Sequence, residues 1–295
     1  MSPRTSARLM LILAAILWSS SGLLLKSLPE VHWLVIAGVR SAFGLFLFLP
    51  GFTQPRPPAG KLALGVGLYI LLVSTLMGSM QLGTAAQGIW LQYLAPAVVA
   101  LWAWRVQKQS LRPAETVAVV LTVAALGLIV TGGGGRAHAQ SVLLGVLSGF
   151  GFGFFILFLK SLGSAPPASI FVWTNLGTAA VLLPLAALLG VRFPTAPREW
   201  LLLALMGTGQ LCLPYYFFKR ALVHARAVEA SLLALLEPIL NPIWVFLVMG
   251  EVPPGRVVIG CALIAVGLVA FAVSPRAGAE TPEVKEGGAV LPSKP

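Results

Sequence analysis

Residues 23–28 read LLLKSL, and residues 157–162 read LFLKSL, 134 positions later in the chain. The other matches, in the same order, are Pro50 with Pro184, LQYLAP at 91–96 with LALLEP at 233–238, and Gly127 with Gly267. Similar strings that recur in register indicate an internal repeat, and a repeat decides the architecture of a chain. We therefore expect two similar halves.

The chain between and around these strings is strongly apolar. Of its residues, 58% are hydrophobic and 10% are charged, and the mean hydropathy is +0.91, whereas soluble domains carry about 25% charged residues. A helix that crosses a bilayer needs about 20 mostly apolar residues. Runs of this kind lie at 8–28, 33–50, 62–80, 84–104, 115–131, 141–160, 168–189, 199–218, 227–249 and 256–273. These runs predict an all-α membrane protein with ten transmembrane helices.

The basic residues in the gaps between the runs predict the orientation. Lysine and arginine concentrate in the cytoplasmic loops of membrane proteins. With the N-terminus in the cytoplasm, the outer gaps hold only Arg136, Arg192, Arg198 and Arg256. We therefore expect a multi-pass protein of the cell (inner) membrane with both termini cytoplasmic. The net charge of +11 then reports orientation, and it does not indicate nucleic-acid binding, which needs a clustered basic face on soluble structure.

Each half has five helices, and because five is an odd number of crossings, the second half enters the membrane from the opposite side. The predicted organisation is a first repeat at 1–131, a linker at 132–140, a second repeat at 141–274, and a disordered cytoplasmic tail at 275–295. The tail is rich in Pro, Gly and Glu and cannot bury enough apolar surface to fold. Inverted repeats are typical of secondary transporters, in which one repeat rocks against the other around a midplane site.

Two segments resemble a known family. The stretch AVEASLLALLEPILNPIWVFLVMGEVPP at 227–254 resembles the Glu-Pro and Gly-Glu signature of EamA-type proteins of the drug/metabolite transporter superfamily, and AAILWSSSGLLLKSL at 14–28 and Arg40 are also similar to that family. The resemblance covers 8–273. It implies ten helices, cytoplasmic termini, a central cavity between the repeats, and a role in moving small metabolites, often outward. One departure is that Lys108-Gln109 stands where the second half has Gly250-Glu251.

Two ionisable residues lie near the middle of predicted spans, Arg40 in the second and Glu237 in the ninth. Each costs at least about 2.5–3.5 kcal/mol at the bilayer centre and must face a partner or a cavity. One interpretation is a buried ion pair, or bonds to backbone carbonyls. In the other, Arg40 clamps a substrate carboxylate and Glu237 takes a proton or an ammonium group, because a desolvated glutamate can titrate near neutral pH.

Further polar and aromatic side chains inside the spans are candidates for the cavity wall, since polar groups in lipid turn inward to find partners. The substrate-binding candidates are Trp18, Gln87, Trp90, Tyr93, Trp173, Asn175 and Tyr215. For the tryptophans and tyrosines, ordinary core packing is the alternative. Pro96, Pro238 and Pro242 are expected to bend their helices and free carbonyls, either beside the cavity or for packing curvature alone.

Residues near the helix ends have simpler expected roles. Lys26 and Lys160 occupy matched positions, where they either snorkel to the interface or form gating contacts at the two mouths. Glu229 follows Arg226 closely, and we expect a surface ion pair between them. A further set, Gly145, Gly149 and Gly153, recurs every four residues and is expected to permit close helix packing.

Together these features predict a secondary transporter that moves small organic metabolites, amino-acid-like or amphipathic, by alternating access, with export favoured. No nucleotide-binding motif is present, so the solute gradient or protons would power it, without a cofactor. A lipid flippase or scramblase of the same fold is the alternative. An intramembrane enzyme is disfavoured because His32, His138 and His224 lie in different loops. The oligomeric state stays open between monomer and homodimer.

Overall fold

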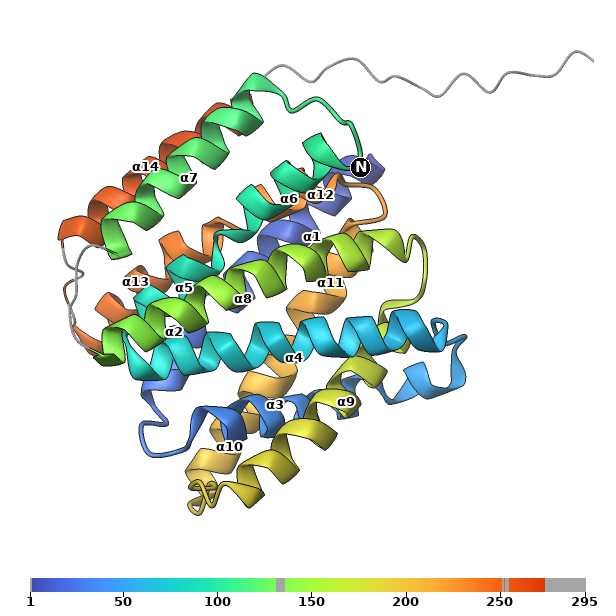
Figure 1. Ribbon diagram of the computed structural model, residues 1–295, viewed down its shortest axis with the longest axis vertical. Coiled ribbons are helices and arrows are strands. Elements are labelled where there is room, and N and C mark those ends of the chain that lie inside the picture. The colour runs from blue at the N-terminus through green and yellow to red at the C-terminus, as the bar shows by residue number, and fades with distance from the viewer. Residues whose placement is uncertain (1, 131–135, 251, 253–254, 274–295) are drawn as a thin grey trace, which may run out of the picture.

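The computed structural model describes residues 2–130, 136–250, 252 and 255–273, and all regular structure within these ranges is helical (Figure 1). The elements of the first half are α1 (Pro3–Trp18), α2 (Ser21–Lys26), α3 (Trp33–Phe48), the 3₁₀ helix η1 (Leu49–Thr53), α4 (Ala59–Leu82), α5 (Ala85–Gln92), α6 (Ala95–Arg105) and α7 (Pro113–Val130). Those of the second half are α8 (Arg136–Ser161), α9 (Pro167–Leu188), α10 (Pro197–Leu205), the π-helix η2 (Met206–Cys212), α11 (Leu213–Ala221), α12 (Ala227–Leu233), α13 (Leu236–Met249) and α14 (Gly255–Val273). The predicted tail at 275–295 and positions 132–135 of the predicted linker lie outside the described residues.

Seven segments among the described residues are long and apolar enough to cross a membrane. They are Pro3–Lys26, Trp33–Thr53, Ala59–Leu82, His138–Ser161, Pro167–Leu188, Pro197–Ala221 and Ala227–Val248. Two shorter apolar helices cover Pro113–Leu128 and Val258–Phe271, and the consecutive helices α5 and α6 are each too short to span alone. The chain is therefore an all-helical, multi-pass membrane protein, and the count of ten spans stays a prediction.

The main helix pairs join the two halves. α7 packs along α14 at one edge of the molecule, and α3 packs along α9 near the other (Figure 1). Each of these pairs joins helices that the sequence repeat matches. The remaining large contacts, α4 with α8 and α1 with α11, are also equivalent to each other under the repeat. This is the packing that a two-fold relation between the halves would produce.

Glycines bring α8 close to α5 and α6. A Cβ added at Gly145 would lie 2.6 Å from the side chain of Leu91, and one at Gly153 would lie 2.8 Å from that of Val98. At Gly149 the added atom would lie 2.8 Å from the Leu91 carbonyl oxygen. Real Cβ atoms avoid such distances, so the expected close packing along this glycine series is confirmed.

Several membrane segments are interrupted, and two interruptions fall at matched places. α5 gives way to α6 at 93–94, and α12 gives way to α13 at 234–235. Pro96 is the second residue of α6 and Pro238 the third of α13, and proline lacks the N–H that would continue the helical hydrogen bonds. The first segment also breaks, at 19–20, and the wide turns of η2 interrupt the α10–α11 segment. Such irregular backbone in a membrane is tolerated where protein or a cavity surrounds it.

Ion pairs gather at the face of the bundle where α1 begins, which we call the N-terminal face. Arg8 pairs with Glu229 at 2.6 Å, and Arg226 pairs with Glu115 at 2.8 Å. The expected Arg226–Glu229 pair is therefore wrong. Both residues use partners on other helices, so these contacts tie α12 to α1 and α7. Glu115 is fully buried and also accepts a hydrogen bond from the Arg112 backbone N–H.

Candidate substrate site

Arg40 lies in the middle of α3 with only 2% of its surface exposed. Its Nη1 donates to the sulfur of Met77 at 3.2 Å, and its Nε has no hydrogen-bond partner among the described residues. Gly207 of η2 lies directly against the Arg40 carbonyl oxygen, where an added Cβ would collide. The guanidinium is thus held deep in the bundle with weak partners for its charge.

Tyr69, Cys212 and Tyr215 lie within electrostatic range of this guanidinium, and Asn175 lies beside Tyr69 and Cys212; with Arg40 these four residues form what we call the Arg40 group. Gly44, one turn after Arg40, makes room for Asn175 and Cys212, which both lie against its backbone. The Asn175 Nδ2 donates to the Phe171 carbonyl oxygen at 2.8 Å, whereas its Oδ1 and the Tyr69 hydroxyl have no partner within the described structure. The Arg40 group therefore combines helices α3, α4, α9 and α11 with the π-helix η2 around unsatisfied polar atoms.

Glu237 forms a second polar group at the break between α12 and α13. The Tyr93 hydroxyl, at the matching break between α5 and α6, donates to the Glu237 Oε2 at 2.6 Å. Both side chains are buried. Because a tyrosine O–H to a carboxylate is a charge-assisted bond, this contact joins the two broken segments across the repeat.

Asn241 anchors the break in the first segment to α13. It lies against Gly22, and its Nδ2 donates to the Ser19 carbonyl oxygen at 2.7 Å. The Trp244 Nε1 donates to the Ser19 hydroxyl, also at 2.7 Å. Three interrupted segments are therefore joined here, two through Tyr93 and Glu237 and the first through Ser19 and Asn241.

Arg40 and Glu237 do not form a direct ion pair. No nitrogen of Arg40 lies within 4.0 Å of an oxygen of Glu237, although the two charges are near enough to interact. Tyr215 lies within electrostatic range of both. The mutual ion pair that the sequence suggested is therefore not formed. The Glu237 carboxyl accepts a hydrogen bond from the Tyr93 hydroxyl instead.

Aromatic rings fill the space around Tyr215. Its ring centroid lies 4.9 Å from that of Trp18, 5.5 Å from those of Tyr69 and Phe171, and 5.8 Å from that of Phe155. We call these five residues the Tyr215 cluster. The cluster offers an apolar wall of ring faces and edges next to the Arg40 group, with the two groups sharing Tyr69 and Tyr215.

Three predicted site residues make other contacts. Trp90 is buried against Gly260 of α14, and Trp173 packs edge-on against Phe52 at 5.2 Å between ring centroids. The Gln87 Nε2 lies 3.2 Å from the His138 Nδ1. Each of these contacts involves a helix end or an outer helix, whereas Trp18, Arg40, Tyr93, Asn175, Tyr215 and Glu237 lie in or beside the two polar groups.

The two predicted gating lysines differ in their surroundings. Lys26 is exposed. The Lys160 Nζ donates to the carbonyl oxygens of Leu222 at 2.6 Å and Ala225 at 2.7 Å, beyond the end of α11. In return, Lys219 near the end of α11 donates to the carbonyl oxygen of Gly163, just beyond α8. The ends of α8 and α11 are thus fastened by two reciprocal lysine contacts at the N-terminal face.

At the opposite face, Gln81 links α4 to the start of α3, next to the loop that holds the Arg192–Glu199 ion pair. Gln81 accepts a hydrogen bond from the Trp33 N–H and donates one to the Val31 carbonyl oxygen, both at 2.8 Å. His32 caps α3 by accepting from the Leu34 N–H through Nδ1 at 3.2 Å. Partial burial lowers the pKa of His32, which favours the neutral ring that can accept this bond.

Sequence reasoning missed Tyr69, Cys212 and Asn241. Tyr69 lies in the middle of a predicted span, and that position is the signal that would have singled it out. Asn241 is likewise the one amide in the span at 227–249. Cys212 carries no comparable signal, because small residues of this kind are common in membrane helices.

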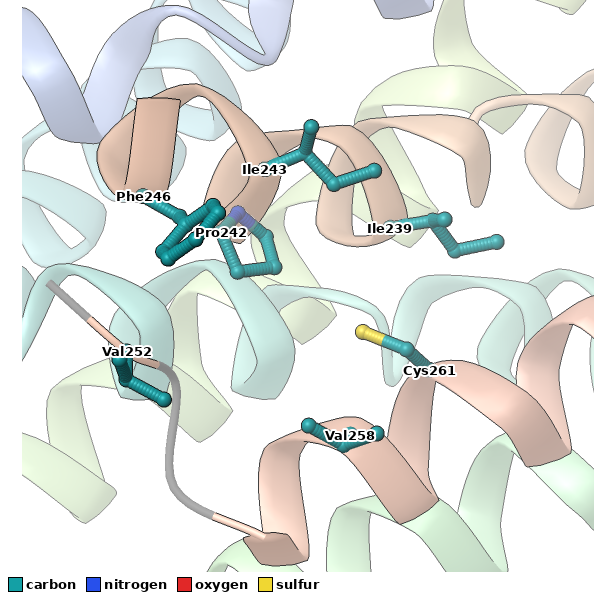
Figure 2. Close-up of a pocket in the computed structure, with 7 residues that line it drawn as sticks. All are labelled: Ile239, Pro242, Ile243, Phe246, Val252, Val258 and Cys261. Carbon is teal, nitrogen blue, oxygen red and sulfur yellow. The ribbon is translucent and has the colours of Figure 1, made fainter. Parts of the chain in front are cut away.

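An apolar groove lies between α13 and α14 (Figure 2). It has a volume of about 380 Å³ and is lined by Ile239, Pro242, Ile243, Phe246, Val252, Val258 and Cys261. None of the predicted substrate-binding residues lines it. Ile243, Phe246 and Val258 are each more than two-fifths exposed, so in a membrane this groove opens towards lipid.

A sequence profile of the EamA-like transporter family matches residues 5–131 and 139–273, which include both polar groups. The chain belongs to the EamA-like transporter family. A curated relative, the uncharacterized transporter YwfM of Bacillus subtilis (strain 168), is 26% identical over 184 residues, a match that spans 62% of each chain. A solved crystal structure covers 90% of this chain and 96% of its own, with a TM-score of 0.74 and 20% identity.

For this EamA-like transporter, the solved structure supports the fold alone. The family and the name of the relative point to a membrane transporter and not to an enzyme. The expectation from the Glu-Pro and Gly-Glu signature is therefore confirmed at the level of family and broad class.

Proposed function

We propose that this protein is a secondary transporter that moves small organic solutes outward across the cytoplasmic membrane by alternating access, with both termini in the cytoplasm. The observation that carries the proposal is the central pairing of Tyr93 with Glu237 across two broken helices, one from each half. Secondary transporters place their substrate and coupling sites at such breaks near the repeat interface.

The contacts at the two faces suggest how access would alternate. At the N-terminal face, the ion pairs Arg8–Glu229 and Arg226–Glu115 cross between the halves. A rocking motion of one half against the other that opens this face must release both pairs. Lys160 is a proposed gating residue next to them, and its two bonds fasten α8 to the loop after α11 within the second half.

Glu237 is the proposed coupling group. It is 3% exposed, and this burial opposes its charged form, whereas the hydrogen bond that it accepts from Tyr93 favours that form. Opening to one side of the membrane would change this balance by admitting water. A carboxyl group that gains and loses a proton with access can couple solute movement to protons.

Proteoliposomes test this proposal directly. Wild-type protein should exchange labelled amino-acid-like solutes, with a rate that depends on pH. Glu237→Gln should flatten the pH dependence, while the matched control Glu199→Gln, whose carboxylate pairs with Arg192 in a loop, should keep it. An unchanged pH profile in Glu237→Gln would remove the proton role, and no exchange of any solute by wild-type protein would contradict transport.

The apolar groove between α13 and α14 favours a second candidate, a lipid flippase or scramblase. A groove without polar lining that opens within the bilayer fits an acyl chain. Liposomes that contain a lipid with a labelled headgroup, compared with liposomes loaded with a labelled amino acid, separate the two functions. Movement of the headgroup between leaflets without movement of the amino acid would favour the lipid function.

A further inference from the structure

The charge of Arg40 is poorly balanced by the protein itself. A guanidinium has five N–H donors and stays charged at all ordinary pH. Here it is buried, and the hydrogen bond found for it goes to a thioether sulfur, which is a weak acceptor. Burying a charge without a hydrogen-bonded counter-ion is expensive, so an anion is the expected partner of this side chain.

The described carboxylates do not supply that anion. Glu115 and Glu229 pair with arginines at the N-terminal face, and Glu199 pairs with Arg192 in a loop. Glu30 is exposed in the loop between α2 and α3. Glu237, the acidic residue nearest to Arg40 in this set, is held by Tyr93 beyond ion-pair distance.

The atoms next to Arg40 fit a carboxylate. The Arg40 Nε and the Tyr69 hydroxyl are both buried, both can donate, and both are unpartnered within the described ranges. Arginine binds carboxylates with two parallel N–H bonds, and a tyrosine O–H adds a third donor. The Ser41 hydroxyl, one residue along α3, is also buried without a partner.

The rest of such a ligand would meet rings. Tyr69 and Tyr215 belong both to the Arg40 group and to the Tyr215 cluster, so the rings nearest to a carboxylate on Arg40 are these two, with Trp18, Phe155 and Phe171 packed against Tyr215. Ligand sites commonly combine an apolar wall with a few placed polar groups. Resting on the proposed transport function, we infer that the Arg40 group binds the carboxylate of the transported solute and the Tyr215 cluster receives its apolar body.

Compounds of matched shape and different charge test the inference. The probes are 3-phenylpropionate, its neutral amide 3-phenylpropionamide and the cation 3-phenylpropylamine, with hexanoate and hexanamide as a second pair. A ligand that binds only the folded protein raises its thermal stability. We expect the two carboxylates to raise the melting temperature of the purified protein and to compete in exchange, and the amides and the amine to do neither.

Substitutions test which residues bind the carboxylate. Arg40→Gln should weaken carboxylate binding at least tenfold, and Tyr69→Phe should weaken it several-fold while keeping the ring contacts with Tyr215. The matched control Arg220→Gln removes an exposed arginine of α11 that contacts Tyr216, and it should leave binding unchanged. If Arg40→Gln does not fold, Tyr69→Phe still tests the site.

The outcomes separate this inference from the proposed function. Equal effects of acid and amide on wild-type protein, no effect of either carboxylate, or an unchanged preference in Tyr69→Phe would overturn the inference even if transport of other solutes is observed. Carboxylate binding that depends on Arg40 and Tyr69 would support it even if liposomes show no exchange, in which case transport alone would be contradicted.

Discussion

The α5–α6 segment and the α12–α13 segment have nearly the same backbone and different chemistry. In both, a two-residue break separates the helices, and a proline lies in the first turn of the second helix, at Pro96 and Pro238. At matched positions, however, the first segment has Tyr93 and Ala95 where the second has Leu235 and Glu237. The hydroxyl and the carboxyl that meet at the centre are therefore divided between the halves, and neither half contains the pair alone.

The ends of the two segments also share a backbone conformation and differ in their residues. Gly250 adopts a left-handed conformation with φ of 70°, and Lys108, at the matched position, adopts nearly the same one with φ of 56°. In the described chain Lys108 is the one non-glycine residue with positive φ. The repeat has thus kept a backbone conformation that usually requires glycine, even where the residue is lysine.

The largest expected effect comes from giving the second segment the residue of the first. Glu237→Ala places alanine where the first segment has Ala95, removes the coupling group and leaves the Tyr93 hydroxyl buried without its acceptor. We expect a loss of exchange in proteoliposomes of more than tenfold. Ala95→Gly, the matched change in the first segment, should keep most of the exchange, and a normal rate in Glu237→Ala would show that the asymmetry has no role in transport.

A double-mutant cycle sharpens the comparison by measuring the bond between the segments. Tyr93→Phe and Glu237→Ala, each of which removes one partner of the bond, should each lower the free energy of unfolding in detergent. Their combined effect should be smaller than the sum by about 1–3 kcal/mol, since a buried hydrogen bond to a charged group is lost only once. Additive effects would mean that the 2.6 Å hydrogen bond between Tyr93 and Glu237 does not stabilise the folded protein.

The two prolines test whether the breaks are equivalent. Pro96→Ala and Pro238→Ala each restore an N–H and should let the segment straighten. We expect stability changes within about 1 kcal/mol for both. Exchange should slow several-fold only in Pro238→Ala, because the neighbouring Glu237 would turn with the helix. Equal slowing in both variants would assign the breaks to packing alone.

The smallest expected effect concerns the left-handed positions. Gly250→Ala should destabilise the protein by about 1 kcal/mol, because alanine is strained at positive φ. Lys108→Gly should stabilise it by up to about 1 kcal/mol, because it relieves the strain and the greater freedom of glycine in the unfolded chain offsets part of this gain. Thermal unfolding of both variants measures the difference, and the same sign for both would contradict a shared conformation.

The sequence repeat predicted much of the backbone. Pro96 and Pro238, which end the matched strings LQYLAP and LALLEP, were expected to bend their helices, and a break precedes each; the glycine series of α8 predicted close packing without naming its partners α5 and α6. The family followed from the Glu-Pro and Gly-Glu segments. These features are local in sequence, so a single chain is enough to reveal them.

The direction in which side chains point was harder to predict. In a membrane helix the lipid-facing side is as apolar as the buried side, so hydropathy did not show that Trp90 faces α14 or that Trp173 faces η1. Contacts between distant residues were also hidden. Tyr93 and Glu237 are 144 positions apart, and the ion pair of Glu229 lies with Arg8 on another helix and not with the nearby Arg226.

The π-helix η2 contains an extra residue relative to a continuous α-helix. Its hydrogen bonds, at Met206–Cys212, each span one residue more than those of an α-helix. If that residue passed out of the turn, everything after Cys212 would rotate by about 100° and advance by about 1.5 Å, the step of one residue in an α-helix. Such a screw motion would swing the Tyr215 ring away from Trp18 and withdraw Lys219 from Gly163 in a single movement.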